Sequence, residues 1–199
     1  MTLALAQVVG DIASAFKAVD DTHPVGSSKS KKYRPGIGPL PEAEAIRRAL
    51  QQLRTIRPEA YKDAGPRPYP GTKQKCDFVV PGEWAIEFKL IRPFGDNGKE
   101  AEHWSENILH PYPGNVSSIG DALKLAASGF SERKGIIVFG YEHIPPQIML
   151  ETAVSAFELL AKQIAGICLG ARHSAEFGPL VHPFHQQGKV FGWEIQPSG

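Results

Sequence analysis

Apolar residues recur every three or four positions in four segments of the chain, which is the spacing of an amphipathic helix. The predicted helices cover residues 2–19, 41–56, 117–127 and 147–165, and a shorter helical piece is predicted around 102–109. Pro41 stands at the start of the second helix, where its missing amide proton leaves no helical hydrogen bond unmade. Helices therefore account for much of the apolar pattern.

Between these helices the apolar residues gather in short runs of strand length. Residues 76–80 and 84–91 flank a Pro-Gly pair and predict a β-hairpin. Further strands are predicted at 135–140, 167–171 and 190–195. Helices and strands in this order predict an α/β fold with a mixed central β-sheet flanked by helices.

Proline and glycine mark the long loops. The chain holds 17 Pro and 20 Gly in 199 residues, which exceeds average usage but stays below the range of disordered proteins. Much of the excess lies between Pro24 and Gly82. The length fits one domain. We therefore divide the chain into an N-terminal helical appendage with a basic arm, residues 1–40, and a single α/β domain, residues 41–199.

Charge and cysteine content narrow the class of protein. Lys and Arg number 22 and Asp and Glu 21, a formal net charge of +1, which excludes a histone-like polycation but permits a local basic cleft. No stretch approaches the roughly 18 apolar residues of a membrane span, so no membrane partner is expected. Two cysteines make no disulfide framework, and a reducing, cytoplasmic location is predicted.

Charged residues interrupt the second strand of the hairpin. Side chains alternate along a strand, so Glu87 and Lys89 share one face of an otherwise apolar segment. Burial of such charges is unfavourable unless they are paired or bind a metal. If the turn centres on Gly82, Asp77 lies opposite Glu87, with Cβ atoms about 4.5–5.5 Å apart. Two carboxylates at that separation repel each other unless a cation lies between them.

This arrangement predicts a magnesium site. Mg²⁺ keeps several waters and takes one or two protein carboxylates, so Asp77 and Glu87 would bind it, and Mn²⁺ can substitute. Lys89 would orient the attacking water or stabilise developing negative charge. These groups suit hydrolysis of a phosphodiester bond. The alternative is a surface salt bridge between the same side chains.

The hairpin resembles the motif of the PD-(D/E)XK nuclease superfamily, which has the restriction-endonuclease-like fold. The resemblance rests on Asp77, followed after nine residues by Glu87-x-Lys89 inside an apolar strand. Cys76 stands where the family's proline would be. The family order of a helix, a strand meander, a helix and a further strand matches residues 41–141, about half of the chain, although its first strand is not readable.

The resemblance implies a Mg²⁺-dependent endodeoxyribonuclease of restriction or phage-defence type, with the two hairpin carboxylates as metal ligands. Many members also carry a Glu on the first core helix, facing the metal. Glu42 and Glu44 are the candidates, and Glu42 is preferred because it shares the inward helical face of Ile46. Glu42 would act through a bound water.

Two other charged patterns are given a structural interpretation. The segment Glu132-Arg133-Lys134 has the same acid-x-lysine pattern as the hairpin, but we interpret it as a solvated loop between a helix and a strand. Asp121 and Lys124 stand on the next predicted helix and are assigned to a solvated helix face, although they could line the same site.

Basic residues before the hairpin predict contacts with nucleic-acid phosphates. The arm contributes one group and the approach to the hairpin another: Lys31, Lys32, Arg34, Arg67, Lys73 and Lys75. A solvated flexible arm is the alternative for the first group. DNA is the expected partner, although RNA stays open, and sequence preference would come from the loops at 57–73 and 92–116.

Cutting both strands of DNA with one site per chain favours a homodimer. The N-terminal helix, with Val8, Val9, Ile12 and Phe16 along it, is the expected interface. Two other functions are compatible with the same residues. One is a structure-specific repair or junction nuclease of the same fold, and the other is a catalytically inactive α/β interaction protein.

Overall fold

The computed structural model describes residues 2–28, 31–110 and 117–196. The helices are α1 (Leu5–Asp20), α2 (Glu42–Ile56), α3 (Pro58–Tyr61), α4 (Glu106–Leu109), α5 (Ser118–Ala126) and α6 (Leu150–Gln163). The strands are β1 (Ser27–Ser28), β2 (Lys31–Lys32), β3 (Gly65–Pro68), β4 (Lys75–Val80), β5 (Trp84–Ile91), β6 (Arg133–Glu142), β7 (Cys168–Leu169), β8 (His173–Phe177) and β9 (Gln187–Gln196).

Seven of these strands form one mixed sheet, in the order β3-β4-β5-β6-β9-β7, with β8 also paired to β9. The β5–β6 pair is parallel and the other pairs are antiparallel. A parallel pair needs a crossover connection, and α4 and α5 lie in the segment that makes it. The predicted α/β fold, a mixed central sheet flanked by helices, is confirmed.

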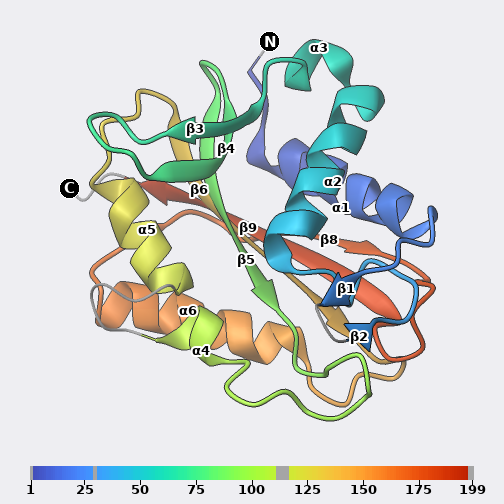
Figure 1. Cartoon of the computed structure of the whole chain (residues 1–199). Helices are drawn as coiled ribbons and strands as arrows, with labels where there is room; N and C mark the ends of the chain where they lie inside the picture. Colours follow the sequence, from blue (N-terminus) through green and yellow to red (C-terminus); the bar gives the residue numbers. More distant parts are fainter. Residues whose placement is uncertain (1, 29–30, 111–116, 197–199) are drawn as a thin grey trace.

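Helices cover both faces of the sheet, with α1 and α2 on one side and α4, α5 and α6 on the other (Figure 1). Each side has its own apolar core, one formed with α1 and α2 and the other with α5 and α6. Strand β5 contributes to both and is buried along its whole length. Charged side chains on β5 are therefore enclosed by helices rather than solvated.

The apolar side of α1 belongs to the core that α1 and α2 form with the sheet. The prediction that this helix is an appendage and a dimer interface is therefore corrected. Val8, Val9, Ile12 and Phe16 are at most 1 % exposed. The Phe16 ring lies 4.6 Å from the ring of Phe139 in β6. These side chains are already covered by the sheet and cannot form the contact between two chains.

The turn of the hairpin fixes its register as predicted. Gly82 has a φ of +73°, a conformation that glycine adopts without steric cost. Phe78 pairs with Ile86 and Val80 with Trp84, so the turn centres on Gly82. Continuation of this register places Asp77 beside Glu87.

Several elements differ from their predicted form. β3 and β8 were not predicted, because short, half-exposed strands lack an apolar alternation. The segment 132–134 is not a solvated loop: β6 begins at Arg133, whose guanidinium lies 4.0 Å from the Trp84 ring. Pro41 precedes α2 as its N-cap and does not lie within its first turn.

Among the described residues, none of the helices has both the length and the apolar character needed to cross a bilayer.

Candidate active site

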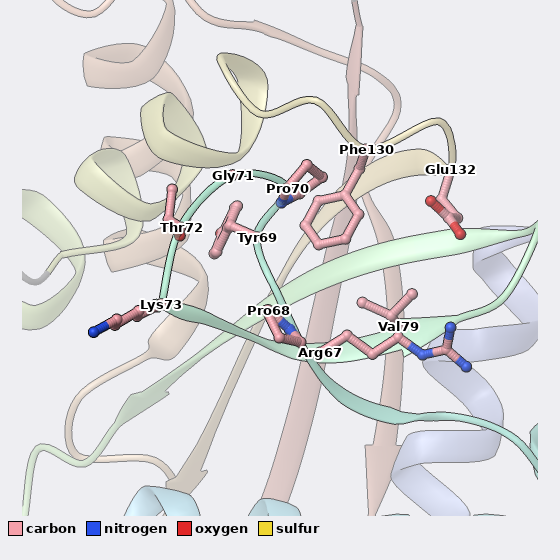
Figure 2. A pocket seen from close by; sticks show the side chains of 10 residues that line it. All are labelled: Arg67, Pro68, Tyr69, Pro70, Gly71, Thr72, Lys73, Val79, Phe130 and Glu132. Carbon is pink, nitrogen blue, oxygen red and sulfur yellow. The ribbon is translucent and has the colours of Figure 1, made fainter.

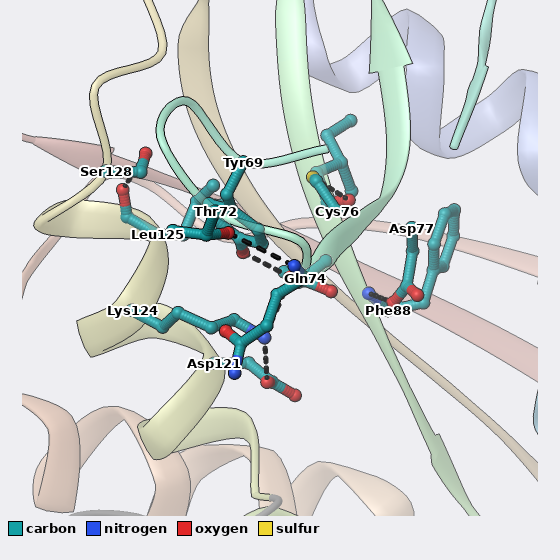
Figure 3. Close-up of polar contacts among 12 residues, drawn as sticks. Tyr69, Thr72, Gln74, Cys76, Asp77, Phe88, Asp121, Lys124, Leu125 and Ser128 are labelled. Carbon is teal, nitrogen blue, oxygen red and sulfur yellow. Dashed lines mark hydrogen bonds and ion pairs between the residues drawn. The ribbon is translucent and has the colours of Figure 1, made fainter. Parts of the chain in front are cut away.

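The second half of β5 has an edge that β4 no longer covers. The ladder between the two strands is regular as far as the pair Phe78–Ile86. Beyond it, the Phe88 N–H donates to Asp77 Oδ2 at 3.0 Å (Figure 3), and the Leu90 N–H donates to Glu42 Oε2 at 2.6 Å. Buried N–H groups require an acceptor, so these hydrogen bonds bring a carboxylate from β4 and one from α2 to the edge of the same strand.

Helix α5 supplies the partners of the charges on β5. Glu87 is 3 % exposed and Lys89 6 %. Lys89 Nζ lies 2.8 Å from Asp121 Oδ2, and Lys124 Nζ lies 2.9 Å from Asp121 Oδ1 and 3.0 Å from Glu87 Oε1. Figure 3 shows Lys124 and Asp121 side by side on the helix. Asp121 thus joins the two lysines, and Lys124 joins Asp121 to Glu87.

Sequence reasoning assigned Asp121 and Lys124 to a solvated helix face, and that interpretation is wrong. Asp121 is buried. Part of this arrangement could be inferred from the sequence. Ser117 caps α5 by accepting the Gly120 N–H, which fixes where the helix begins, and residues three apart on a helix, such as Asp121 and Lys124, share a face. The sequence did not say which face of α5 meets the sheet.

Tyr69, on the loop after β3, completes the surroundings of Glu87 and was missed entirely. Its hydroxyl donates to Glu87 Oε1, and Lys124 Nζ lies 5.2 Å from the centre of its ring. A tyrosine in a Pro/Gly-rich loop has no periodic signal, so only the tertiary structure identifies it.

Two carboxyl groups of this cluster, those of Glu42 and Glu87, have raised pKa values. Burial, followed by the hydrogen bond and negative charge of Asp77, raises the pKa of Glu87 from 4.5 to about 8, although Tyr69 and Lys124 oppose this. Burial also raises the pKa of Glu42, against the attraction of Lys89. Glu87 therefore holds its proton to a higher pH than an ordinary glutamate does.

The cluster holds more carboxyl groups than ammonium groups. Asp77, Glu87, Asp121 and Glu42 face the ammonium groups of Lys89 and Lys124, which leaves an excess of two negative charges when all six are ionised. No group of three or more His, Cys, Asp or Glu side chains within the described residues forms a ready-made metal site. Mg²⁺ can be held by as few as one or two protein carboxylates, and Asp77 and Glu87 are the pair that the sequence predicted for it.

Glu42 lies at the cluster and Glu44 does not. Glu44 pairs with Arg47 at 2.7 Å and with Arg48 at 2.7 Å. The hydrogen bonds from these arginines lower the pKa of Glu44 to about 2. The two glutamates are two residues apart and therefore face different sides of α2.

Basic residues border a hollow next to the cluster. The hollow has a volume of about 640 Å³ and is lined by Arg67, Lys73, Tyr69 and Phe130, among others. Figure 2 shows Arg67 and Lys73 extending in opposite directions. Tyr69 belongs both to this hollow and to the surroundings of Glu87. Lys75 is exposed at the start of β4, next to the same loop.

The basic arm is only partly described. Lys31 and Lys32 form β2, but their side chains lie outside what the structure describes. Arg34 is exposed, with its guanidinium 5.0 Å from the Phe184 ring and its N–H donating to Asp96. The structure thus ties Arg34 to the segments around Asp96 and Phe184.

Comparison of the chain with protein-family models, curated proteins and solved structures finds no match. The resemblance of the hairpin to a nuclease motif therefore stands on the residues described above.

Proposed function

We propose that the protein is a Mg²⁺-dependent endodeoxyribonuclease with a restriction-endonuclease-like core, which hydrolyses phosphodiester bonds of DNA in restriction or phage defence. The observation that carries the proposal is the pair of half-buried Asp77 and buried Glu87. Burial and Asp77 together raise the pKa of Glu87, whose Oε1 lies 3.0 Å from Lys124 Nζ. A plain salt bridge pairs opposite charges, whereas here two carboxyl groups, those of Asp77 and Glu87, interact with each other.

Each residue has a role that its position supports. Asp77 and Glu87 would hold Mg²⁺, which when bound polarises a phosphate oxygen and lowers the pKa of water. Asp77 Oδ2 is fixed by the Phe88 N–H, which leaves its second oxygen for the ion. Glu42, fixed by the Leu90 N–H, would hold a water. Lys89 would stabilise negative charge and is itself held in place by Asp121.

DNA would approach from the side of the β3–β4 turn, where Arg67, Lys73 and Lys75 are exposed. Contacts from such side chains to phosphates position a duplex without reading its sequence. A homodimer would serve to cut both strands, with an interface away from the buried side of α1.

The decisive experiment measures cleavage of supercoiled plasmid by purified protein in Mg²⁺ or in EDTA. Wild type is compared with Glu87→Gln, which keeps the shape but removes the charge, and with Glu176→Gln as a control, because Glu176 is exposed on β8. We expect cleavage in Mg²⁺ by wild type and control, and a rate lower by about a thousandfold, or about 4 kcal/mol, for Glu87→Gln.

Cleavage that persists in EDTA or in Glu87→Gln would exclude this mechanism. The same assay on linear duplex, a branched junction and RNA separates the alternatives. Strong preference for the junction would favour a repair nuclease. The absence of cleavage of every substrate would favour the inactive interaction protein.

A further inference from the structure

Lys124 occupies an unusual place in the cluster. Its Nζ lies 3.0 Å from Glu87 Oε1 and 2.9 Å from Asp121 Oδ1, so one ammonium group bridges two carboxylates. One of these carboxylates, Glu87, is a proposed ligand of the metal. An ammonium group that contacts a ligand oxygen directly supplies the positive charge which a cation would otherwise supply.

The two lysines differ in their freedom to move. The Lys89 side chain is 8 % exposed, lies on the central strand β5 and is enclosed against Asp121. The Lys124 side chain is 35 % exposed and belongs to the last turn of α5. Lys124 can therefore turn its ammonium group into solvent without disturbing the sheet, whereas Lys89 cannot.

A divalent cation at Glu87 and an ammonium group on the same carboxylate repel each other strongly, because few charges lie between them to screen the interaction. We infer that Lys124 is the built-in counter-ion of the metal site and leaves Glu87 when a divalent cation binds. Lys124 thereby sets the affinity of the site for the cation. The inference rests on the metal site of the proposed function and adds a residue that neither the motif nor its spacing indicates.

The test is binding of Mn²⁺, measured without DNA from the electron paramagnetic resonance signal of the free ion. Lys124→Met removes the competing charge and should bind Mn²⁺ about tenfold more tightly than wild type. Lys124→Arg keeps the charge and should bind within about threefold of wild type. Lys162→Met removes an exposed lysine from α6 and serves as the control, with wild-type affinity expected.

An affinity of Lys124→Met equal to or weaker than that of wild type would overturn the inference, as would the absence of Mn²⁺ binding in both proteins. Lys124→Gln provides a second neutral variant, and its thermal unfolding shows whether the fold is intact. Because no DNA is present, metal binding is measured separately from DNA cleavage. Tighter binding by Lys124→Met in a protein that cuts no DNA supports the counter-ion role and rejects the nuclease.

Discussion

One cluster of carboxyl groups and lysines lies at Glu87 on β5, and a second lies at Lys189 on β9. In the second, Lys189 Nζ lies 2.8 Å from Glu142 Oε2 and 2.6 Å from Glu151 Oε1. Glu142 Oε1 also accepts the Leu150 N–H at the start of α6. Both clusters combine a strand, a helix and buried charges.

The pKa values of Glu87 and Glu151, one from each cluster, are shifted in opposite directions. Burial works against ionisation of Glu151, but its hydrogen bonds with Lys189 and the backbone lower its pKa overall. The pKa of Glu87 is instead raised, because burial and Asp77 outweigh Tyr69 and Lys124. The lysine and the backbone together outweigh burial at Glu151, whereas burial and a second carboxyl group prevail at Glu87; under the proposed function, the second arrangement would take up an added cation.

The largest effect is expected from removal of the Lys189 ammonium group from its cluster. Lys189→Met leaves Glu142 buried with an unpaired charge and should lower the free energy of unfolding by about 3–5 kcal/mol. The melting temperature should fall by about 10 °C. Thermal unfolding with Lys162→Met as the control measures this, and a fall below about 2 °C would show that the ion pair is not structural.

The next effect is on the pH dependence of stability. Glu87 has a pKa of about 8 when folded, against an ordinary value of 4.5. Its contribution to stability is therefore complete below pH 4.5 and is lost as pH rises through 8. Glu151 has a lowered pKa, so its contribution is present above pH 4.5 and is lost as pH falls through the folded value. The contribution of Glu87 is on the order of a few kcal/mol, and that of Glu151 is smaller, because its side chain is 37 % exposed and solvent screens its charge.

Urea unfolding between pH 3 and 9 measures both contributions. Glu87→Gln should flatten the decline in the free energy of unfolding between about pH 4.5 and 8, and Glu151→Gln should flatten the acid decline. If Glu87→Gln leaves the decline between these pH values intact, Glu87 does not hold its proton as the structure indicates.

A smaller effect is expected from metal. At pH 8, 10 mM MgCl₂ should raise the melting temperature by about 2–5 °C, if the dissociation constant is on the order of 1 mM. The rise should be smaller at pH 6, because Mg²⁺ binds ionised Glu87 in competition with its proton. EDTA should reverse it. Glu151→Gln should retain the rise and Glu87→Gln should lose it; retention by Glu87→Gln would place the ion elsewhere.

The smallest effect is expected at Glu44, whose ion pairs with Arg47 and Arg48 are partly solvated. Glu44→Gln should change the free energy of unfolding by less than about 0.5 kcal/mol. It should also leave the Mg²⁺-dependent rise in melting temperature unchanged. Urea unfolding and thermal unfolding in MgCl₂ check both points. Loss of the Mg²⁺ effect would indicate that Glu44, and not Glu42, takes part in the site.

Local patterns predicted much of the fold and part of the site. The helices and the hairpin follow from the spacing of apolar residues, and Gly82 gave the register that places Asp77 beside Glu87. The helical face of Ile46 selected Glu42 over Glu44, in agreement with the position of Glu42 at Leu90. Each inference needed only neighbours in the sequence.

Other features depend on contacts between distant segments. The strands β3 and β8 form because a partner strand supplies their hydrogen bonds, and not because of their own apolar pattern. The apolar side of α1 looks the same in sequence whether it meets a second chain or the sheet of its own chain. Only packing against residues such as Phe139 decides between them.

The sequence by itself determined that a carboxylate and a lysine share one face of an apolar strand, since alternation along a strand is a property of the backbone. Only the tertiary structure decided what surrounds them. It brings Asp121 and Lys124 from α5 and Tyr69 from a loop to Glu87 and Lys89. Burial and the charges of these distant groups determine the pKa of Glu87. Neither can be inferred from the residues next to Glu87 in the sequence.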